Sequence, residues 1–160
     1  MFSDFGESLA SAASTFAVIV LAEMGDKTQL VCMTLSLRHR AMPVFAGVVL
    51  AFAVLNVIAV AVGAALSDWI PEKALNIIVA VLFGAFGIRA LKSKAQDRQP
   101  EVRGQSGRNV FTIAFAMIFI SETGDKTQIA VAGLSSTADP GAVWVGATLA
   151  LAVTSALGVL

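Results

Sequence analysis

The sequence predicts an all-α integral membrane protein built as an inverted repeat of transmembrane helices. The 160-residue chain is 57% hydrophobic and has a mean hydropathy of +0.82, whereas apolar residues make up about 45–50% of a soluble domain. The apolar residues gather in segments long enough to cross about 30 Å of hydrocarbon at about 1.5 Å per residue. A polar stretch of nine residues interrupts two of these segments in nearly identical form. These observations favour a duplicated membrane fold over a soluble domain.

We expect five membrane spans, with short turns at residues 67–71 and 135–140. The spans are predicted at residues 9–37, 43–66, 72–91, 109–134 and 141–160. The first three-helix repeat then occupies 1–91, a polar linker occupies 92–108, and the second repeat occupies 109–160 with two helices. The second repeat lacks a counterpart of the span at 72–91. We expect either a truncated chain, which we favour, or another subunit that supplies the missing surface.

The repeated stretch reads AEMGDKTQL at residues 22–30 and SETGDKTQI at residues 121–129. The two copies lie 99 positions apart, and the same offset aligns Gly47 with Gly146. Carboxylates inside an apolar segment are costly and by default mark functional sites. With three spans per repeat, the second copy enters the membrane from the opposite side. The two copies are therefore expected to meet near the membrane midplane.

The basic residues lie almost entirely on one side of the predicted topology. If the spans alternate, one face carries eight of the eleven lysines and arginines, the other carries Lys73, and two lie in the motifs. The positive-inside rule then places the 38–42 turn and the 92–108 linker in the cytoplasm and the N-terminus outside. We therefore expect a multi-pass protein of the inner (plasma) membrane, surrounded by lipid. A formal net charge of zero gives no indication of a nucleic-acid partner.

The oxygen-bearing residues of the two motifs are the candidate metal ligands. They are Glu23, Asp26, Gln29, Glu122, Asp125 and Gln128. Residues three apart share a face of an unbroken helix, so one helix would present Glu23 with Asp26 and another the equivalent pair. Antiparallel crossing would bring four carboxylates into one cavity. Oxygen ligands of this kind, with no Cys or His beside them, suit hard divalent cations such as Mg²⁺, Ca²⁺ or Mn²⁺.

Four further motif residues are candidates for a supporting role. They are Lys27, Thr28, Lys126 and Thr127. Each lysine follows a glutamate by four residues and could pair with the carboxylates until a cation competes for them. The threonine hydroxyls could assist at the site or bond back to their own helix, and the sequence gives both alternatives equal weight. Four carboxylates cannot all ionise cheaply in an apolar cavity, so an arriving metal should displace protons.

Other polar residues of the apolar segments have simpler explanations. Cys32 is expected to be a packing residue, His39 a solvated residue between two arginines, and Asn56 a partner in an interhelical hydrogen bond. The glycines of the spans are expected to mediate close helix packing. This set comprises Gly47, Gly63, Gly84, Gly87 and Gly146.

The acidic motifs allow three other interpretations. Each cluster could be a buried ion-pair network, which the duplication makes less attractive. A membrane-embedded metal-dependent hydrolase would need a nucleophile or an activated water, and the sequence has no Ser/His pairing and no HExxH motif. A structural or assembly subunit would not depend on the carboxylates. We therefore expect no enzyme, no catalytic residue and no permanently bound cofactor.

The pattern Glu-x-Gly-Asp-Lys-Thr, at Glu23–Thr28 and again at Glu122–Thr127, resembles the Gdt-type cation/proton antiporter family. This family includes eukaryotic transmembrane protein 165 and bacterial MneA-type manganese exporters. The resemblance covers nearly the whole chain and implies six spans, one more than the sequence predicts. It also implies that Glu23, Asp26, Glu122 and Asp125 bind Mn²⁺ or Ca²⁺ in exchange for protons.

The short loops and small size resemble the bacterial members, in which manganese efflux is the expected duty. We therefore expect a secondary transporter that exports Mn²⁺, with Ca²⁺ as a second substrate, from the cytoplasm in exchange for protons. A Ca²⁺/H⁺ antiporter is the alternative. The expected partners are the divalent cation, protons and membrane lipids, and assembly as a homo-oligomer stays open.

Overall fold

The structure is a computed structural model that describes residues 2–92 and 110–159, and the regular secondary structure of these residues is entirely helical. The helices are α1 (Phe2–Glu23), α2 (Lys27–Arg38), α3 (Ala41–Trp69), α4 (Glu72–Lys92), α5 (Val110–Glu122), α6 (Lys126–Ser135) and α7 (Pro140–Val159). The predicted all-α class is confirmed. The predicted polar linker, apart from its first residue, lies outside the described residues.

Three of the described helices are long and apolar enough to cross a membrane. They are Phe5–Glu23, Ala41–Trp69 and Pro140–Val159. Side chains such as Val57, Ile58 and Val62 on α3 stay exposed although they are strongly apolar, as expected where lipid replaces water. The apolar parts of α4 and α5, Lys73–Ala85 and Val110–Glu122, are shorter. The structure therefore has the character of a helical membrane protein.

Two of the predicted spans are broken in the middle. The segment predicted at 9–37 forms α1 and α2, and the segment predicted at 109–134 forms α5 and α6. Each break contains a glycine with positive φ, +80° at Gly25 and +79° at Gly124. This left-handed conformation costs glycine little, and it commonly ends a helix. The duplicated sequence therefore produces the same break twice.

The second of the five predicted spans is longer than predicted. Helix α3 begins at Ala41 and ends at Trp69, beyond both ends of the predicted 43–66 segment. Pro43 lies in the first turn of α3, where a missing backbone N–H costs no intrahelical hydrogen bond. The predicted turn at 67–71 shortens to Ile70 and Pro71, before α4 begins at Glu72.

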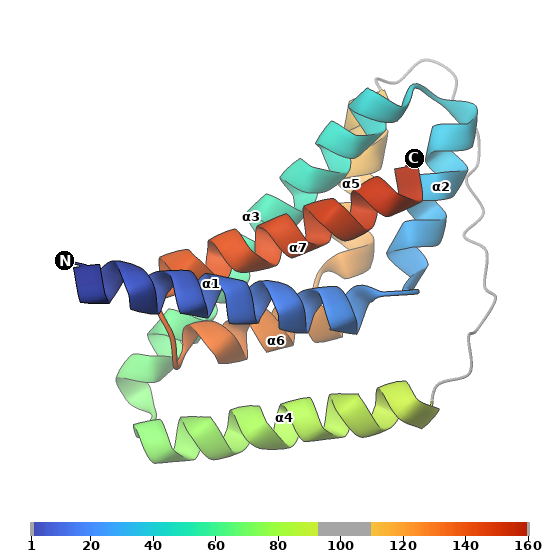
Figure 1. Ribbon diagram of the computed structural model, residues 1–160. Coiled ribbons are helices and arrows are strands. Elements are labelled where there is room, and N and C mark those ends of the chain that lie inside the picture. Colours follow the sequence, from blue (N-terminus) through green and yellow to red (C-terminus); the bar gives the residue numbers. More distant parts are fainter. Residues whose placement is uncertain (1, 93–109, 160) are drawn as a thin grey trace.

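The packing between the two repeats follows the sequence offset. The 99-residue offset relates α1 to α5 and α3 to α7. Helix α1 packs along α7, and in the same way α5 packs along α3. In the same way α2 contacts α7, and α6 contacts α3. Figure 1 shows α3 and α7 crossing near the centre, α1 beside α7, and α4 beneath α6 at one side. Helices α3 and α7 therefore form the central pair.

Glycines allow the closest approaches between the repeats. A Cβ atom on Gly47 would lie 2.5 Å from the carbonyl oxygen of Phe111 on α5. At the repeat-related position, a Cβ atom on Gly146 would lie 2.4 Å from the carbonyl oxygen of Ala12 on α1. The predicted packing role is confirmed at these two glycines and at Gly63, which abuts α6. It is wrong for Gly84 and Gly87, because in the part of the chain that the structure describes a Cβ on either would meet no atom of another helix within 4 Å.

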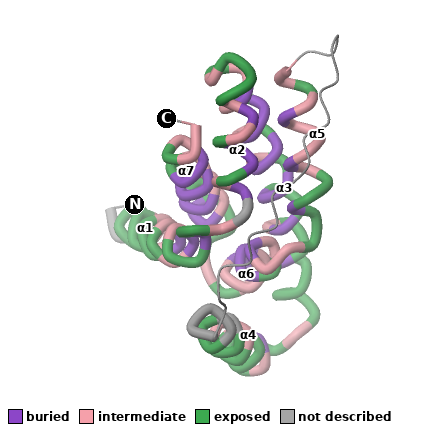
Figure 2. The backbone as a smooth tube through the Cα atoms, turned by 90° about the vertical axis from the view of Figure 1, so that its right-hand side faces the viewer, coloured by how far each residue is buried: buried purple, intermediate pink, exposed green. Residues whose placement is uncertain are grey.

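Buried residues concentrate on α3, α7 and the short helices α2 and α6, whereas α4 is mostly exposed (Figure 2). The core is rich in small and β-branched side chains, such as Val48 and Ala51 on α3 and Ala147 and Ala150 on α7. Small residues allow helix backbones to approach closely in a membrane. Asn56 donates to Thr148 Oγ1 on α7 over 3.1 Å, as predicted.

Two further sequence predictions hold in the described residues. Cys32 is fully buried in the core between α2 and α7, so its expected role in packing is confirmed. His39 is exposed in the turn between α2 and α3, as expected for a solvated residue.

Candidate metal-binding site

The two helix breaks carry the repeated motifs into the interior. Glu23 ends α1 and Glu122 ends α5, whereas Asp26 and Asp125 immediately precede α2 and α6. The expectation that Glu and Asp share one helical face is therefore wrong, because the glycine between them ends the helix. The backbone has the same geometry in both breaks, since Asp26 N donates to Glu23 O over 3.1 Å and Asp125 N donates to Glu122 O over 3.2 Å.

Three of the four predicted carboxylates come together across the repeats. One carboxylate oxygen each from Glu23, Asp26 and Asp125 lies within 4.8 Å of the others. Two of these residues come from the first break and one from the second, as expected for a shared site. Three carboxylate oxygens at this separation could coordinate one hard divalent cation, with water completing its shell.

Asp125 does not cap α6 with its side chain. It occupies the N-cap position of α6, where Asp commonly accepts a hydrogen bond from a first-turn N–H. Its side chain makes no such bond. The adjacent N-terminal end of α6 carries partial positive charge, which stabilises a carboxylate at this position.

Glu122 stands outside this group of three and is held by the opposite repeat. Its Oε1 accepts a hydrogen bond of 2.7 Å from the hydroxyl of Thr28. The repeat-related hydroxyl of Thr127 donates to Glu23 Oε1. All four side chains are buried, with exposed fractions between 2% for Glu23 and 9% for Glu122. Both threonine hydroxyls therefore bond across the repeats and not back to their own helices.

The aspartates lie closer to the surface than the glutamates. Asp26 pairs with Lys126 of the other repeat, at 2.6 Å between Oδ2 and Nζ, and these side chains are 19% and 37% exposed. The glutamates thus form the deep part of the polar centre, and Asp26 with Lys126 forms a part nearer the surface. The side chain of Lys27, the other predicted lysine, lies outside the described residues.

The side chain of Gln29 forms hydrogen bonds both to the first break and to α7. Its Oε1 accepts a hydrogen bond from Gly25 N over 3.2 Å, and its Nε2 donates to the carbonyl oxygen of Thr154 on α7 over 3.3 Å. The amide therefore connects the break to the central helix pair, a function that the motif spacing did not reveal. Gln128 lies at the equivalent place in α6 and is half-buried.

The fold and the site together define a class of protein. Long apolar helices, two broken helical segments and an acidic centre at the breaks are features of secondary transporters, in which discontinuous helices place ion-binding groups inside the membrane. The polar centre carries carboxylates, hydroxyls and a lysine. The class is a membrane protein with an internal acidic site.

The chain belongs to the divalent cation/proton antiporter GDT1 family, whose family model matches residues 11–98 and 110–160. It is 31% identical to a Vibrio cholerae protein named "Putative manganese exporter", over 87% of this chain and 70% of that protein. It is 25% identical to GDT1-like protein 3 of Arabidopsis thaliana, over 92% of this chain and 59% of that protein. It is 28% identical to Protein PAM71, chloroplastic, of the same plant, over 99% of this chain and 50% of that protein.

The chain spans about three-fifths of the length of the GDT1-like plant relatives that it matches. No solved structure matches it.

Proposed function

We propose that this protein is a secondary transporter that exports Mn²⁺ from the cytoplasm and admits protons in exchange, with Ca²⁺ as a second substrate. Membership of the divalent cation/proton antiporter family supports exchange of a divalent cation for protons. The name of the Vibrio cholerae relative supports manganese as the cargo. The observation that carries the proposal is the convergence of Glu23, Asp26 and Asp125 from two repeats.

In the proposed site, the three converging carboxylates bind the cation directly. Glu122 completes the predicted quartet as a fourth acid, and the amides of Gln29 and Gln128 are additional oxygen donors. Hard cations accept such oxygen ligands. Mn²⁺ and Ca²⁺ share this preference, so a Ca²⁺/H⁺ antiporter is the alternative form of the same proposal.

Coupling to protons follows from electrostatics. Several carboxylates so close together and shielded from water cannot all be ionised without a compensating cation. In the proposed cycle a divalent cation arriving from the cytoplasm displaces protons, and protons entering from outside release the cation there. Lys126 pairs with Asp26 over 2.6 Å. The cation must therefore compete with Lys126 for this carboxylate.

The proposed arrangement in the membrane is an inverted repeat whose two broken segments meet in the interior. Five spans are proposed in this chain. Two are broken spans, one formed by α1 and α2 and the other by α5 and α6. The remaining three are the single helices α3, α4 and α7. The equivalent backbone breaks and the offset-related packing of α1 on α7 and α5 on α3 support this assignment. The positive-inside rule supports an outer N-terminus and a cytoplasmic 92–108 linker in the plasma membrane.

The test is ion flux in proteoliposomes that contain the purified protein and a pH-sensitive dye. An imposed pH gradient should drive Mn²⁺ movement, and Mn²⁺ entering should move protons the other way. Ca²⁺ should compete more strongly than Mg²⁺, because Mg²⁺ dehydrates reluctantly and demands octahedral geometry. Mn²⁺ flux that is unaffected when the pH gradient is dissipated would refute antiport. Faster transport of Ca²⁺ than of Mn²⁺ under the same pH gradient would favour the Ca²⁺/H⁺ alternative.

A further inference from the structure

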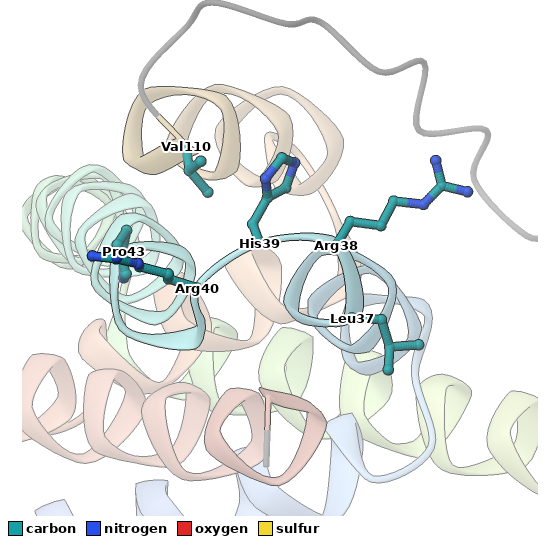
Figure 3. Close-up of a pocket in the computed structure, with 6 residues that line it drawn as sticks. All are labelled: Leu37, Arg38, His39, Arg40, Pro43 and Val110. Atoms are coloured by element: carbon teal, nitrogen blue, oxygen red, sulfur yellow. The ribbon is translucent and has the colours of Figure 1, made fainter.

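The hollow on the surface beside the α2–α3 turn does not gather ligand groups. It has a volume of about 590 Å³ and is lined by residues around this turn and by Val110 at the start of α5. The side chains of Arg38 and Arg40 are directed away from each other (Figure 3). The two guanidinium groups therefore do not converge on one ligand. A buried polar group without a partner lies instead in the core, on α7.

The hydroxyl of Ser155 is buried and makes no hydrogen bond. Ser155 is 2% exposed, and its Oγ finds no partner among the residues that the structure describes. A hydroxyl in a helix commonly bonds back to a carbonyl oxygen of the preceding turn, as the neighbouring Thr154 does to Leu151 O over 3.1 Å. Ser155 makes no such bond. Because an unpaired hydroxyl in a core is costly and rare, it points to a bound water or ion.

This hydroxyl faces α2. Ser155 lies beside the thiol of Cys32, but a thiol is a weak hydrogen-bond partner and leaves the hydroxyl unsatisfied. One turn further along α7, a Cβ atom on Gly158 would lie 2.8 Å from Gln29 O and 3.2 Å from the Cβ of Cys32. Small side chains therefore allow α7 to approach α2 closely around this polar pair.

The place adjoins the acidic centre. Cys32 follows Thr28 by four residues, so their side chains share one face of α2. The hydroxyl of Thr28 donates to Glu122 Oε1 over 2.7 Å, and the Glu122 carboxylate is close enough to the Cys32 thiol to act on it through its charge. A hydroxyl, a thiol and a carboxylate are therefore neighbours at the contact of α2 with α7.

The repeat-related place is filled differently. The 99-residue offset relates Cys32 to Val131 and Ser155 to Asn56. Asn56 has a longer polar side chain, which reaches Thr148 Oγ1 over 3.1 Å, and Val131 is bulkier than Cys32. The smaller residue of each related pair thus lies at the contact of α2 with α7, where the hydroxyl is unpaired. This difference favours a small polar molecule in the position that the Asn56 amide takes in the other place.

We propose that Ser155, Cys32 and Glu122 bind one buried water molecule at the contact of α2 with α7. Buried waters commonly make about three hydrogen bonds to polar groups that otherwise lack partners, and these three side chains supply that number. The water links the Glu122 carboxylate to α7, so Ser155 and Cys32 are positioning residues of the acidic centre although both lie outside the motifs. The binding of this water does not depend on the proposed transport.

Infrared spectroscopy of the purified protein in detergent tests the proposal. Cys32 is the one cysteine of the chain, so the S–H stretching band reports on this place alone. After transfer to D₂O, exchange through the bound water should convert the Cys32 thiol rapidly to the S–D form. In the Cys32→Ala/Val131→Cys variant the thiol occupies the repeat-related, equally buried position, and it should exchange about tenfold more slowly because exchange there requires local opening of the core. Equal rates for the two thiols would overturn the proposal.

A second substitution distinguishes a bound water from a hydroxyl that has no partner. Ser155→Ala removes one hydrogen bond to the water, so the unfolding temperature should fall by about 2–4 °C in a chain of this size, and the Cys32 S–H band should shift. Ser14→Ala removes an exposed hydroxyl that bonds only to Ser11 O in its own helix, and it should change neither property. An unfolding temperature of Ser155→Ala at or above that of the parent protein would show that the hydroxyl holds no water and would overturn the proposal.

Discussion

The hydroxyl of Thr28 donates a hydrogen bond to Glu122 Oε1 over 2.7 Å, although 94 positions separate the two residues. The repeat-related hydroxyl of Thr127 donates to Glu23. Each buried carboxylate therefore receives its hydroxyl from the opposite repeat. This exchange ties the two helix breaks together, so the polar arrangement of either repeat depends on the presence of the other.

Replacing Thr28 with Ala should lower both stability and cation transport. The substitution leaves a buried carboxyl group without its donor, and such a loss costs about 1–3 kcal/mol. Thr28→Ser keeps a hydroxyl and should restore most of both properties. Thermal unfolding in detergent and Mn²⁺ flux in proteoliposomes measure the two effects.

The matched control for this prediction is Thr34→Ala on the same helix. The hydroxyl of Thr34 donates to the carbonyl oxygen of Leu30 in its own helix over 2.7 Å. This substitution should change stability and flux little. If Thr28→Ala and Thr34→Ala behaved alike, the bond between Thr28 and Glu122 would have no special role.

Replacing Asp125 with Asn should abolish most Mn²⁺ transport, because it removes a negative charge from the group of three carboxylates at nearly constant shape. Loss of a group that merely supports a metal ligand commonly costs about 10- to 100-fold, so loss of a direct ligand should cost at least as much. Cells expressing the variant should become hypersensitive to manganese. Asp68→Asn, which alters an exposed acid near the end of α3, is the control. Normal efflux by well-expressed Asp125→Asn or Asp125→Ala protein would exclude the proposed site.

The sequence predicted the helical class, the repeated motif and the meeting of its two copies. It did not place Glu23 and Asp26 correctly relative to each other, because spacing rules for an unbroken helix were applied across Gly25. A glycine in a helical pattern is compatible with either a continuous helix or a break, and only the observed φ of +80° distinguishes them. Boundaries and local conformation thus depended on information that spacing alone did not contain.

The partners of the motif side chains were also beyond prediction from one sequence. The sequence favours a local and a functional role for Thr28 equally, since its hydroxyl can reach a carbonyl group in its own helix. Which acceptor it finds depends on how α2 lies against α5, a tertiary relationship. The same applies to Lys126, which pairs with Asp26 of the other repeat. The signal that pointed toward such exchange was the repetition of the whole motif, including these residues.

Replacing Lys126 with Met should increase the apparent affinity for Mn²⁺. Lys126 Nζ lies 2.6 Å from Asp26 Oδ2 in a partly exposed pair, so an incoming cation must displace it. Partly exposed ion pairs contribute about 0.2–1 kcal/mol, which limits the expected fall in KM to about fivefold. Initial rates of Mn²⁺ flux at several concentrations measure this change. A higher KM would show instead that Lys126 holds Asp26 in its binding position.

Adding one methyl group at Gly25 and at Gly84 should have different effects on stability. Beyond the neighbouring backbone, a Cβ atom at either position meets no atom of the described residues within 4 Å, so neither substitution creates a steric clash with them. Gly25 has a φ of +80°, where a residue with a side chain costs about 1–2 kcal/mol. Gly84 lies inside α4, where Ala is more favourable than Gly by up to about 1 kcal/mol. Gly25→Ala should therefore lower the unfolding temperature, and Gly84→Ala should leave it unchanged or raise it.

The same pair of variants separates the role of the break in transport from its role in stability. Ala at position 25 favours continuation of the helix, which would displace Asp26 from the other carboxylates, so Mn²⁺ flux should fall by more than the loss of folded protein explains. Gly124→Ala should have the same effect, since Gly124 has a φ of +79° in the second break. Flux normalised to folded protein should stay at the parent level in Gly84→Ala. Parent-level flux in both Gly25→Ala and Gly124→Ala would show that transport does not require the left-handed backbone at the two breaks.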